Sequence, residues 1–266
     1  MFIGAGPSGE LRYPAYQLDK WTFPGVGAFQ AFDNYMLAQL KAQATSISKP
    51  EWGYPPTNAG GYNSKPEDTQ FFSNNQQNNW NSEYGQFFLD FYSSSLIAHG
   101  ERIFNAANTI FDGYLFFFFS SKFSLFILFY LFINSYPVSM SFKISGVHWL
   151  YNTDSHAAEL TAGYYNTAQR DGYGPISRML LSVNGSFDFT CLEMRNSEQT
   201  ESARSNPEQL VAQTRGVIYI LILIFKFFLK FTFFEKKKNR VLNLIQLNIV
   251  EKMLLQDMIQ QHMIKL

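Results

Sequence analysis

Apolar side chains recur at helical spacing in two stretches of the first half of the chain. In residues 27–44, "GAFQAFDNYMLAQLKAQA", this spacing predicts a helix with one apolar face. That face comprises Phe29, Phe32, Tyr35, Met36 and Leu40. In residues 84–111, "YGQFFLDFYSSSLIAHGERIFNAANTIF", the same period continues over several turns. Both stretches are predicted to be amphipathic helices.

The segment between these helices has a different character. Residues 52–85, "WGYPPTNAGGYNSKPEDTQFFSNNQQNNWNSEYG", are dense in Pro, Gly and Asn and contain seven aromatic side chains. Turn residues at this density predict a long surface loop, and such loops often carry binding function on a rigid scaffold. A disordered linker is the alternative, but linkers are poor in aromatic residues. We expect a functional loop.

The second half alternates between strand and helix patterns. Strands are predicted at residues 141–151, "SFKISGVHWLY", and 186–194, "SFDFTCLEM". Helices are predicted at residues 155–166, "SHAAELTAGYYN", and 170–185, "RDGYGPISRMLLSVNG". The first strand places Lys143 and His148 near its ends, and Gly185 closes the second helix. Strand, helix and strand in this order predict an α/β fold with parallel packing.

Two segments are unlike the rest because they are almost entirely apolar. Half of the phenylalanine residues lie within Tyr114–Phe132 and Phe225–Phe234. The first segment, "YLFFFFSSKFSLFILFYLF", is close to the length of about 20 apolar residues that spans a bilayer core. From Gly216 the second segment leads into "EKKKNR" and a tail rich in Leu, Ile and Gln. Hydropathy alone indicates a membrane protein.

The charge balance narrows the classes of binding partner, and the cysteine count excludes an intrachain disulfide. The chain has 21 basic and 21 acidic side chains, so no electrostatic feature favours nucleic acid or an anionic membrane surface. A neutral small molecule is the expected partner. Cys191 is the single cysteine, which excludes an intrachain disulfide. The first residues, "MFIGAGPSGE", have no basic or long apolar region that would predict a targeting signal.

The start of the chain contains glycines in the spacing of a dinucleotide-binding loop. Gly4, Gly6 and Gly9 fit G-x-G-x-x-G, a motif that needs a strand before it and a helix after it. Only "MFI" precedes the motif, and Pro14 follows too early for a helix to begin there. A flavin or nicotinamide site is therefore not expected.

The same segment carries a more specific pattern. "GPSGELRYPAY" closely resembles the active-site signature of the plant beta-amylases, and the resemblance covers residues 4–113 and 138–214. It continues through "WTFPGVGAFQ", "PEDTQFF", "WNSEYGQFFLDFYS", "KISGVHWLY", "SHAAELTAGYYN" and "FTCLEMRNSEQ". The resemblance implies the central to C-terminal portion of a (β/α)8 TIM-type barrel, here incomplete. It also implies release of maltose from the non-reducing ends of α-1,4-glucans, with inversion.

The resemblance assigns roles to four residues. Inverting glycosidases use one carboxylic acid to protonate the leaving oxygen and a second carboxylate to activate water. Glu10 matches the family's acid, a role that requires a raised pKa, although a simple ion pair with Arg12 is the alternative. Lys143 and His148 match side chains that hold glucose hydroxyls. Thr190 matches the mobile inner loop, where its hydroxyl stabilises the second carboxylate.

The chain also departs from the family pattern. The family's general base lies in a Gly-Glu-Asn motif, and residues 1–266 contain no such motif. Glu159 in "HAAELTAG" matches a different family glutamate, so the base role is not transferred to it. The earlier barrel strands are absent as well. We therefore expect an inactive polypeptide with starch, maltodextrin or maltose as its ligand, no cofactor, no metal and no nucleic acid.

The apolar segments lie where the family pattern breaks, which suggests translated noncoding sequence. The expected organisation is a partial barrel at residues 1–113, an insert at 114–137, further barrel strands at 138–215 and a non-family tail at 216–266. A membrane protein with two spans is one alternative, and a non-catalytic glucan-binding or regulatory relative is another. "PEDTQFF" and "WNSEYG" look more like chloroplast members of the family than like cytoplasmic ones.

Overall fold

The computed structural model describes residues 1–74, 77–117 and 139–217 of the chain. One compact unit comprises Met1–Thr214, and of a second unit, Arg215–Leu266, only residues 215–217 are described. The longer elements, in chain order, are β1 (Phe2–Ile3), α1 (Asn34–Ser46), α2 (Glu83–Phe117), β2 (Ser141–Ile144), α4 (Ala157–Ala162), α5 (Tyr173–Ser182) and β3 (Ser186–Phe189). Single helical turns occur at η1 (Pro7–Gly9), η2 (Pro50–Trp52), η3 (Pro66–Asp68), η5 (Asn196–Glu198) and η6 (Glu201–Ala203).

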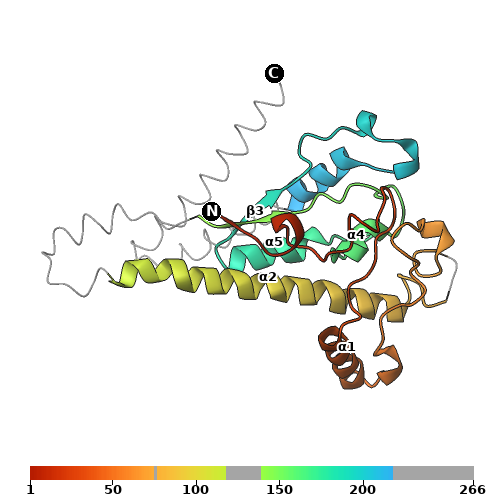
Figure 1. Cartoon of the computed structure of the whole chain (residues 1–266), viewed down its shortest axis with the longest axis horizontal. Helices are drawn as coiled ribbons and strands as arrows, with labels where there is room; N and C mark the ends of the chain where they lie inside the picture. The colour runs from red at the N-terminus through yellow and green to blue at the C-terminus, as the bar shows by residue number, and fades with distance from the viewer. Residues whose placement is uncertain (75–76, 118–138, 218–266) are drawn as a thin grey trace, which may run out of the picture. The chain divides into compact units, whose positions relative to one another are not determined.

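In the described ranges, three strands form one parallel sheet in the order β1-β2-β3, of which β3 is labelled in Figure 1. Phe142 lies opposite Ile3 on one side and opposite Phe187 on the other, and it is fully buried. Parallel neighbours need long crossover connections, and α2 and α5 lie in those connections. The prediction of parallel α/β packing is confirmed.

Both predicted strands were too long. Only Ser141–Ile144 of residues 141–151 and Ser186–Phe189 of residues 186–194 pair in the sheet. Gly146 explains where β2 ends, because a Cβ there would lie 2.5 Å from the Cβ and Sγ atoms of Cys191. The chain turns at this contact, so the prediction that His148 ends a strand is wrong.

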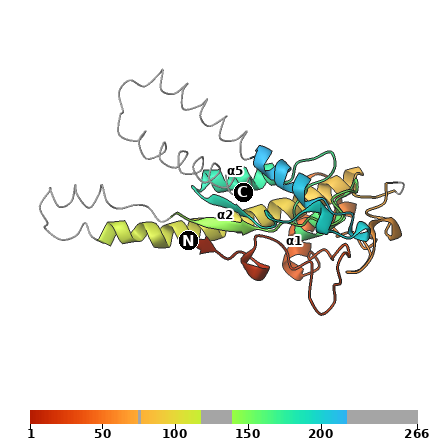
Figure 2. The same cartoon turned by 90° about the horizontal axis from the view of Figure 1, so that it is seen from above.

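Helix α2 is the longest described element, and it packs against α5 (Figure 2). Gly100 allows a close approach in the middle of α2, since a Cβ there would lie 3.0 Å from Leu11 and 3.1 Å from Met179. The predicted helix at residues 84–111 is confirmed. It continues to Phe117, past the boundary predicted after Gly113.

Helix α1 differs from its prediction in the face that it buries. The Asp33 side chain accepts hydrogen bonds from the amides of Tyr35 and Met36, so the helix begins only after Phe32. Leu40 and Ala44 are buried. Phe32 and Tyr35 are exposed, and the prediction that they share the buried face is wrong.

The aromatic side chains of the long loop hold it against the core. Phe71, Phe72 and Trp80 are buried, and Phe71 and Phe72 both pack on Phe29, which precedes α1. Burial of large rings at this scale stabilises a loop by several kcal/mol, roughly 1.5–3 kcal/mol for each ring. The alternative of a disordered linker is therefore wrong for the described part of the loop.

Within the described ranges, no helix is both long enough and apolar enough to cross a membrane. Most of the predicted insert and nearly all of the predicted tail lie outside those ranges.

Candidate functional site

The site is built where the ends of β1 and β2 meet. After β1 the chain makes the single turn η1 and returns to the sheet at Glu10, which pairs with Lys143 of β2 as an isolated parallel bridge. The amide of Leu11 donates to the Lys143 carbonyl at 2.9 Å. In parallel α/β barrels the functional side chains gather at the carboxyl ends of the strands. Glu10 and Lys143 occupy such ends.

Glu10 lies between two cations. The Nε atom of Arg12 donates to Glu10 Oε2 at 2.7 Å, and Lys143 Nζ lies 3.7 Å from Oε1. The side chain of Glu10 is 11% exposed and that of Lys143 is 40% exposed. The structure thus brings the predicted acid and one predicted sugar-binding residue together. It also shows the ion pair with Arg12 that the sequence left as an alternative.

Thr190 follows β3 and is tied to the loop after β2. Its amide donates to the Ile144 carbonyl at 3.1 Å, and its Oγ1 accepts from the Gly146 amide at 2.7 Å. The hydroxyl proton of Thr190 is not used in that second bond, so it remains available to another acceptor. Thr190 therefore stands at the same end of the sheet as Glu10 and Lys143.

His148 lies in the loop after β2 rather than on the strand. It is buried, its Nδ1 is 3.3 Å from Ser205 Oγ, and its carbonyl accepts from the Asn206 amide. Burial lowers the pKa of His148, which favours the neutral imidazole at neutral pH. A neutral ring can both donate and accept a hydrogen bond.

An aromatic wall, defined here as Tyr16, Trp21, Phe23 and Trp149, stands beside His148. The indole N–H groups of Trp21 and Trp149 both donate to the Gly25 carbonyl, at 2.9 and 3.1 Å. Phe23 is 41% exposed, and its ring centre lies 6.2 Å from that of His148. An anchored wall with one exposed ring can receive an apolar sugar face. The motif "WTFPGVG" carried this signal, but the sequence analysis gave it no role.

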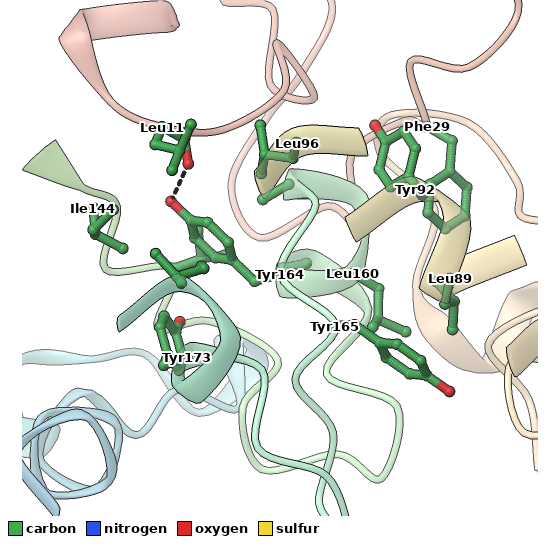
Figure 3. Packing of buried hydrophobic residues seen from close by; sticks show 14 of the residues in the cluster. Leu11, Phe29, Leu89, Tyr92, Leu96, Ile144, Leu160, Tyr164, Tyr165 and Tyr173 are labelled. Carbon is green, nitrogen blue, oxygen red and sulfur yellow. Dashed lines mark hydrogen bonds between the residues drawn. The ribbon is translucent and has the colours of Figure 1, made fainter. Parts of the chain in front are cut away.

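Tyr164 joins the two strand ends on which Glu10 and Lys143 lie. Its hydroxyl donates to the Leu11 carbonyl at 2.8 Å (Figure 3) and accepts from the Ser145 amide at 3.0 Å. Tyr164 is fully buried, and burial raises its pKa strongly, so the hydroxyl keeps its proton. Sequence reasoning missed Tyr164 because a tyrosine in a predicted helix has no distinctive signal.

Glu159 occupies a different environment. It is completely buried, and its Oε1 atom accepts from Asn166 Nδ2 at 3.1 Å and from the Tyr173 hydroxyl at 2.6 Å. His156 Nδ1 lies 2.7 Å from the other oxygen. A carboxylate that is completely buried and held by three partners is not open to a water molecule from solvent.

In the described part of the chain, no three His, Cys, Asp or Glu side chains gather in a way that could hold a metal ion. The polar groups of the site are instead suited to a ligand with several hydroxyl groups.

Comparison with known sequences gives one consistent result. The sequence profile described as glycosyl hydrolase family 14 matches residues 1–130 and 127–219. Beta-amylase 1, chloroplastic, of Arabidopsis thaliana is 51% identical over 214 residues, which are 79% of this chain and 33% of that protein. Beta-amylase 2, chloroplastic, of Oryza sativa subsp. japonica is 47% identical over 79% of this chain and 34% of that protein. The chain thus spans about a third of the length of these relatives.

A solved structure agrees with the sequences. The crystal structure of the catalytic domain of beta-amylase from Paenibacillus polymyxa superposes with a TM-score of 0.60 at 29% identity. The match covers 82% of this chain and 47% of that one. The fold is therefore a portion of a TIM-type barrel, as the sequence predicted.

Proposed function

Because this chain belongs to glycosyl hydrolase family 14, we propose that its Glu10 site binds the non-reducing ends of α-1,4-glucans. The ligands are starch, maltodextrin and maltose. One observation carries the proposal: the family's acid and one of its sugar-binding residues, Glu10 and Lys143, lie in contact across two strand ends. The exposed amine of Lys143 donates to sugar hydroxyls, and the aromatic wall contacts the apolar face of the ring.

Glu10 is the proton donor in the beta-amylase reaction. Arg12 hydrogen-bonds Oε2, so the proton belongs on Oε1, the oxygen that faces Lys143. Lys143 is half-exposed and can swing towards the sugar, which frees Oε1 for the glycosidic oxygen. The inverting reaction then needs a second carboxylate about 6.5–9.5 Å away to activate water.

Among the residues that the structure describes, none matches the family's second carboxylate. Residues 1–266 contain no Gly-Glu-Asn motif, and Glu159 is buried and held by its own partners. Loss of one of two cooperating carboxylates removes most of the rate acceleration, because general acid–base catalysis contributes about 10²–10⁴-fold per group. We therefore propose that the 266-residue polypeptide, taken alone, binds glucan without turning it over.

Maltose release from soluble starch by the purified chain tests this proposal. Release at the background rate is expected, both for the chain and for Glu10→Gln. Robust release that disappears in Glu10→Gln would show that a base is present, and the inactivity proposal would then fail.

Binding is tested separately by isothermal titration with maltose. Lys143→Ala is expected to weaken binding about tenfold, since a hydrogen bond from a charged donor is worth about 1.5–3 kcal/mol. Lys65→Ala, which removes an exposed lysine from the loop, is the matched control and should leave the affinity unchanged. Unchanged affinity in Lys143→Ala would contradict the proposed site.

We also propose a chloroplast location, which the names of the Arabidopsis and rice relatives support. Fractionation of plant cells with an antibody to this chain tests it, and a signal confined to the cytoplasmic fraction would overturn it.

A further inference from the structure

A polar cleft lies outside the Glu10 site, formed by parts of the chain that are far apart in sequence. It has a volume of about 390 Å³, and its polar lining includes Glu67, Asn74, Asn152, Asp154, Ser155 and Arg204. This volume is at the lower end of the range that small-molecule sites occupy. The cleft combines the long loop with the segment that follows His148.

The backbone around the cleft is held in costly conformations. Leu150, His156 and Arg204 have positive φ angles of 58°, 49° and 46°. Left-handed backbone costs about 1–2 kcal/mol for such residues and persists where the surroundings impose it. Two hydrogen bonds impose it here: the Leu150 amide donates to the Ala203 carbonyl at 2.8 Å, and the Asn152 amide donates to the Arg204 carbonyl at 2.9 Å. The lining is therefore preorganised, which lowers the entropic cost of binding a ligand.

Some polar groups of the cleft have unused hydrogen-bonding capacity. Ser155 is only 2% exposed, and its Oγ has no hydrogen-bond partner within the ranges that the structure describes. A buried hydroxyl without a partner costs about 1–3 kcal/mol. Asn152 and Asp154 are exposed at the rim, next to Ser155 in the chain. The Ser155 Oγ atom lies beneath the surface, so the groups that can reach a ligand are the Asp154 carboxylate and the second amide hydrogen of Asn152, whose other hydrogen donates to the Ser205 carbonyl.

The charges of the cleft select the class of ligand. Arg204 and Glu67 form an ion pair at 2.6 Å, and this hydrogen bond lowers the pKa of Glu67, so the pair is neutral as a unit. Asp154 remains as one carboxylate, and it accepts a hydrogen bond from the Asn74 amide. The net negative charge disfavours anions, and the polar rim disfavours apolar ligands. A neutral ligand with many hydroxyl groups fits best.

We propose that this cleft is a second glucan-binding site, separate from Glu10. The identity of the sugar rests on the proposed function, whereas the preference for a neutral polyhydroxy ligand rests on the cleft itself. The segment 203–206 borders both places, since Arg204 lines the cleft while Ser205 contacts His148. A glucan held in the cleft is therefore kept beside the segment that carries His148.

Isothermal titration of the full chain with maltotriose tests the proposal. The wild-type chain is expected to bind two sugars. Asp154→Ala and Asn152→Ala should each remove one of the two binding events or weaken it about tenfold, as expected for a lost hydrogen bond to a charged or amide group. Both residues are exposed, but Asn152→Ala also removes hydrogen bonds to Ser205 and Asn206, so Asp154→Ala is the cleaner of the two variants. Asp68→Ala, an exposed acid on the same loop outside the cleft, is the matched control.

The outcomes separate the two proposals. If Lys143→Ala removes all binding while the cleft variants change nothing, the second site is overturned and the Glu10 site stands. If the cleft variants remove all binding and Lys143→Ala changes nothing, the cleft stands and the Glu10 site falls. Asp154→Asn keeps an acceptor without the charge, so sugar binding should persist. If Asp154→Asn bound maltotriose as weakly as Asp154→Ala, the charge of Asp154 would be required. That result would indicate a cationic ligand and overturn the proposal.

Discussion

Glu10 and Glu159 are the same residue type in two opposite environments. Glu159 is completely buried and has donors or polar partners on both carboxylate oxygens. Glu10 keeps some exposure, and beside Oε1 it has only a half-exposed lysine at 3.7 Å. A fully buried carboxylate that is held by three partners stabilises a fold. One with an oxygen facing a movable side chain can exchange partners for a ligand.

The largest loss of stability is expected when Glu159 is replaced by glutamine, and the same replacement at Glu10 is the comparison. Glu159→Gln places an NH2 group among hydrogen-bond donors and should lower the free energy of unfolding by about 3 kcal/mol. Glu10→Gln should cost about 1 kcal/mol, because the amide oxygen of Gln can still accept from Arg12 and the other partner, Lys143, is 40% exposed. Urea unfolding followed by circular dichroism measures both. Equal losses would show that the two environments do not differ as described.

The contact that ends β2 is the next to test. Gly146→Ala would place a Cβ 2.5 Å from Cys191 and 2.7 Å from the Thr190 carbonyl oxygen. Overpacking of this kind costs about 1–3 kcal/mol. Because Thr190 moves with the contact, maltose affinity should fall as well. Gly61→Ala, where a Cβ meets nothing within 4 Å, is the control and should change neither quantity.

Two tyrosine substitutions distinguish the surroundings of Glu10 from those of Glu159. Tyr164→Phe removes the hydroxyl that joins the Leu11 and Ser145 backbones, whereas Tyr173→Phe removes a donor to Glu159. Each should lower stability by about 1–3 kcal/mol. Only Tyr164→Phe should also weaken maltose binding, as measured by titration calorimetry. If Tyr173→Phe weakened maltose binding as much as Tyr164→Phe, the proposed difference between the two environments would be contradicted.

The smallest effect concerns His148 and pH. Burial lowers its pKa in the folded chain, so between about pH 6.5 and the folded pKa the unfolded chain binds more protons. Stability therefore falls as the pH is lowered from 7.5 to 5.5. His148→Gln should reduce that fall, by about 1 kcal/mol at most. Thermal melting of both proteins at the two pH values measures it, and identical falls would contradict it.

Periodicity and family resemblance predicted the parts of the structure that depend on local sequence. The long helix α2 follows from its sustained apolar period, and the parallel pairing of β2 with β3 follows from the alternation of strand and helix. The pairing of Glu10 with Arg12 was foreseeable because the two residues are adjacent in one motif.

Features that depend on tertiary contacts could not be predicted. The start of α1 is set by the Asp33 side chain, and the end of β2 by the contact of Gly146 with Cys191. The polar cleft needs Glu67, Asp154 and Arg204 to meet, and no local pattern relates three residues so far apart. The position of His148 was missed for the same reason, since the strand before it stops early.

The tight packing of Cys191 against Gly146 also has a chemical consequence. Burial, with a smaller contribution from Glu159, raises the pKa of the Cys191 thiol to about 11. The thiolate is the reactive form, so little of this thiol reacts at pH 8. A cysteine introduced at an exposed position, such as Asp68→Cys beside the cleft residue Glu67, would carry a fluorescent label selectively with Cys191 left in place.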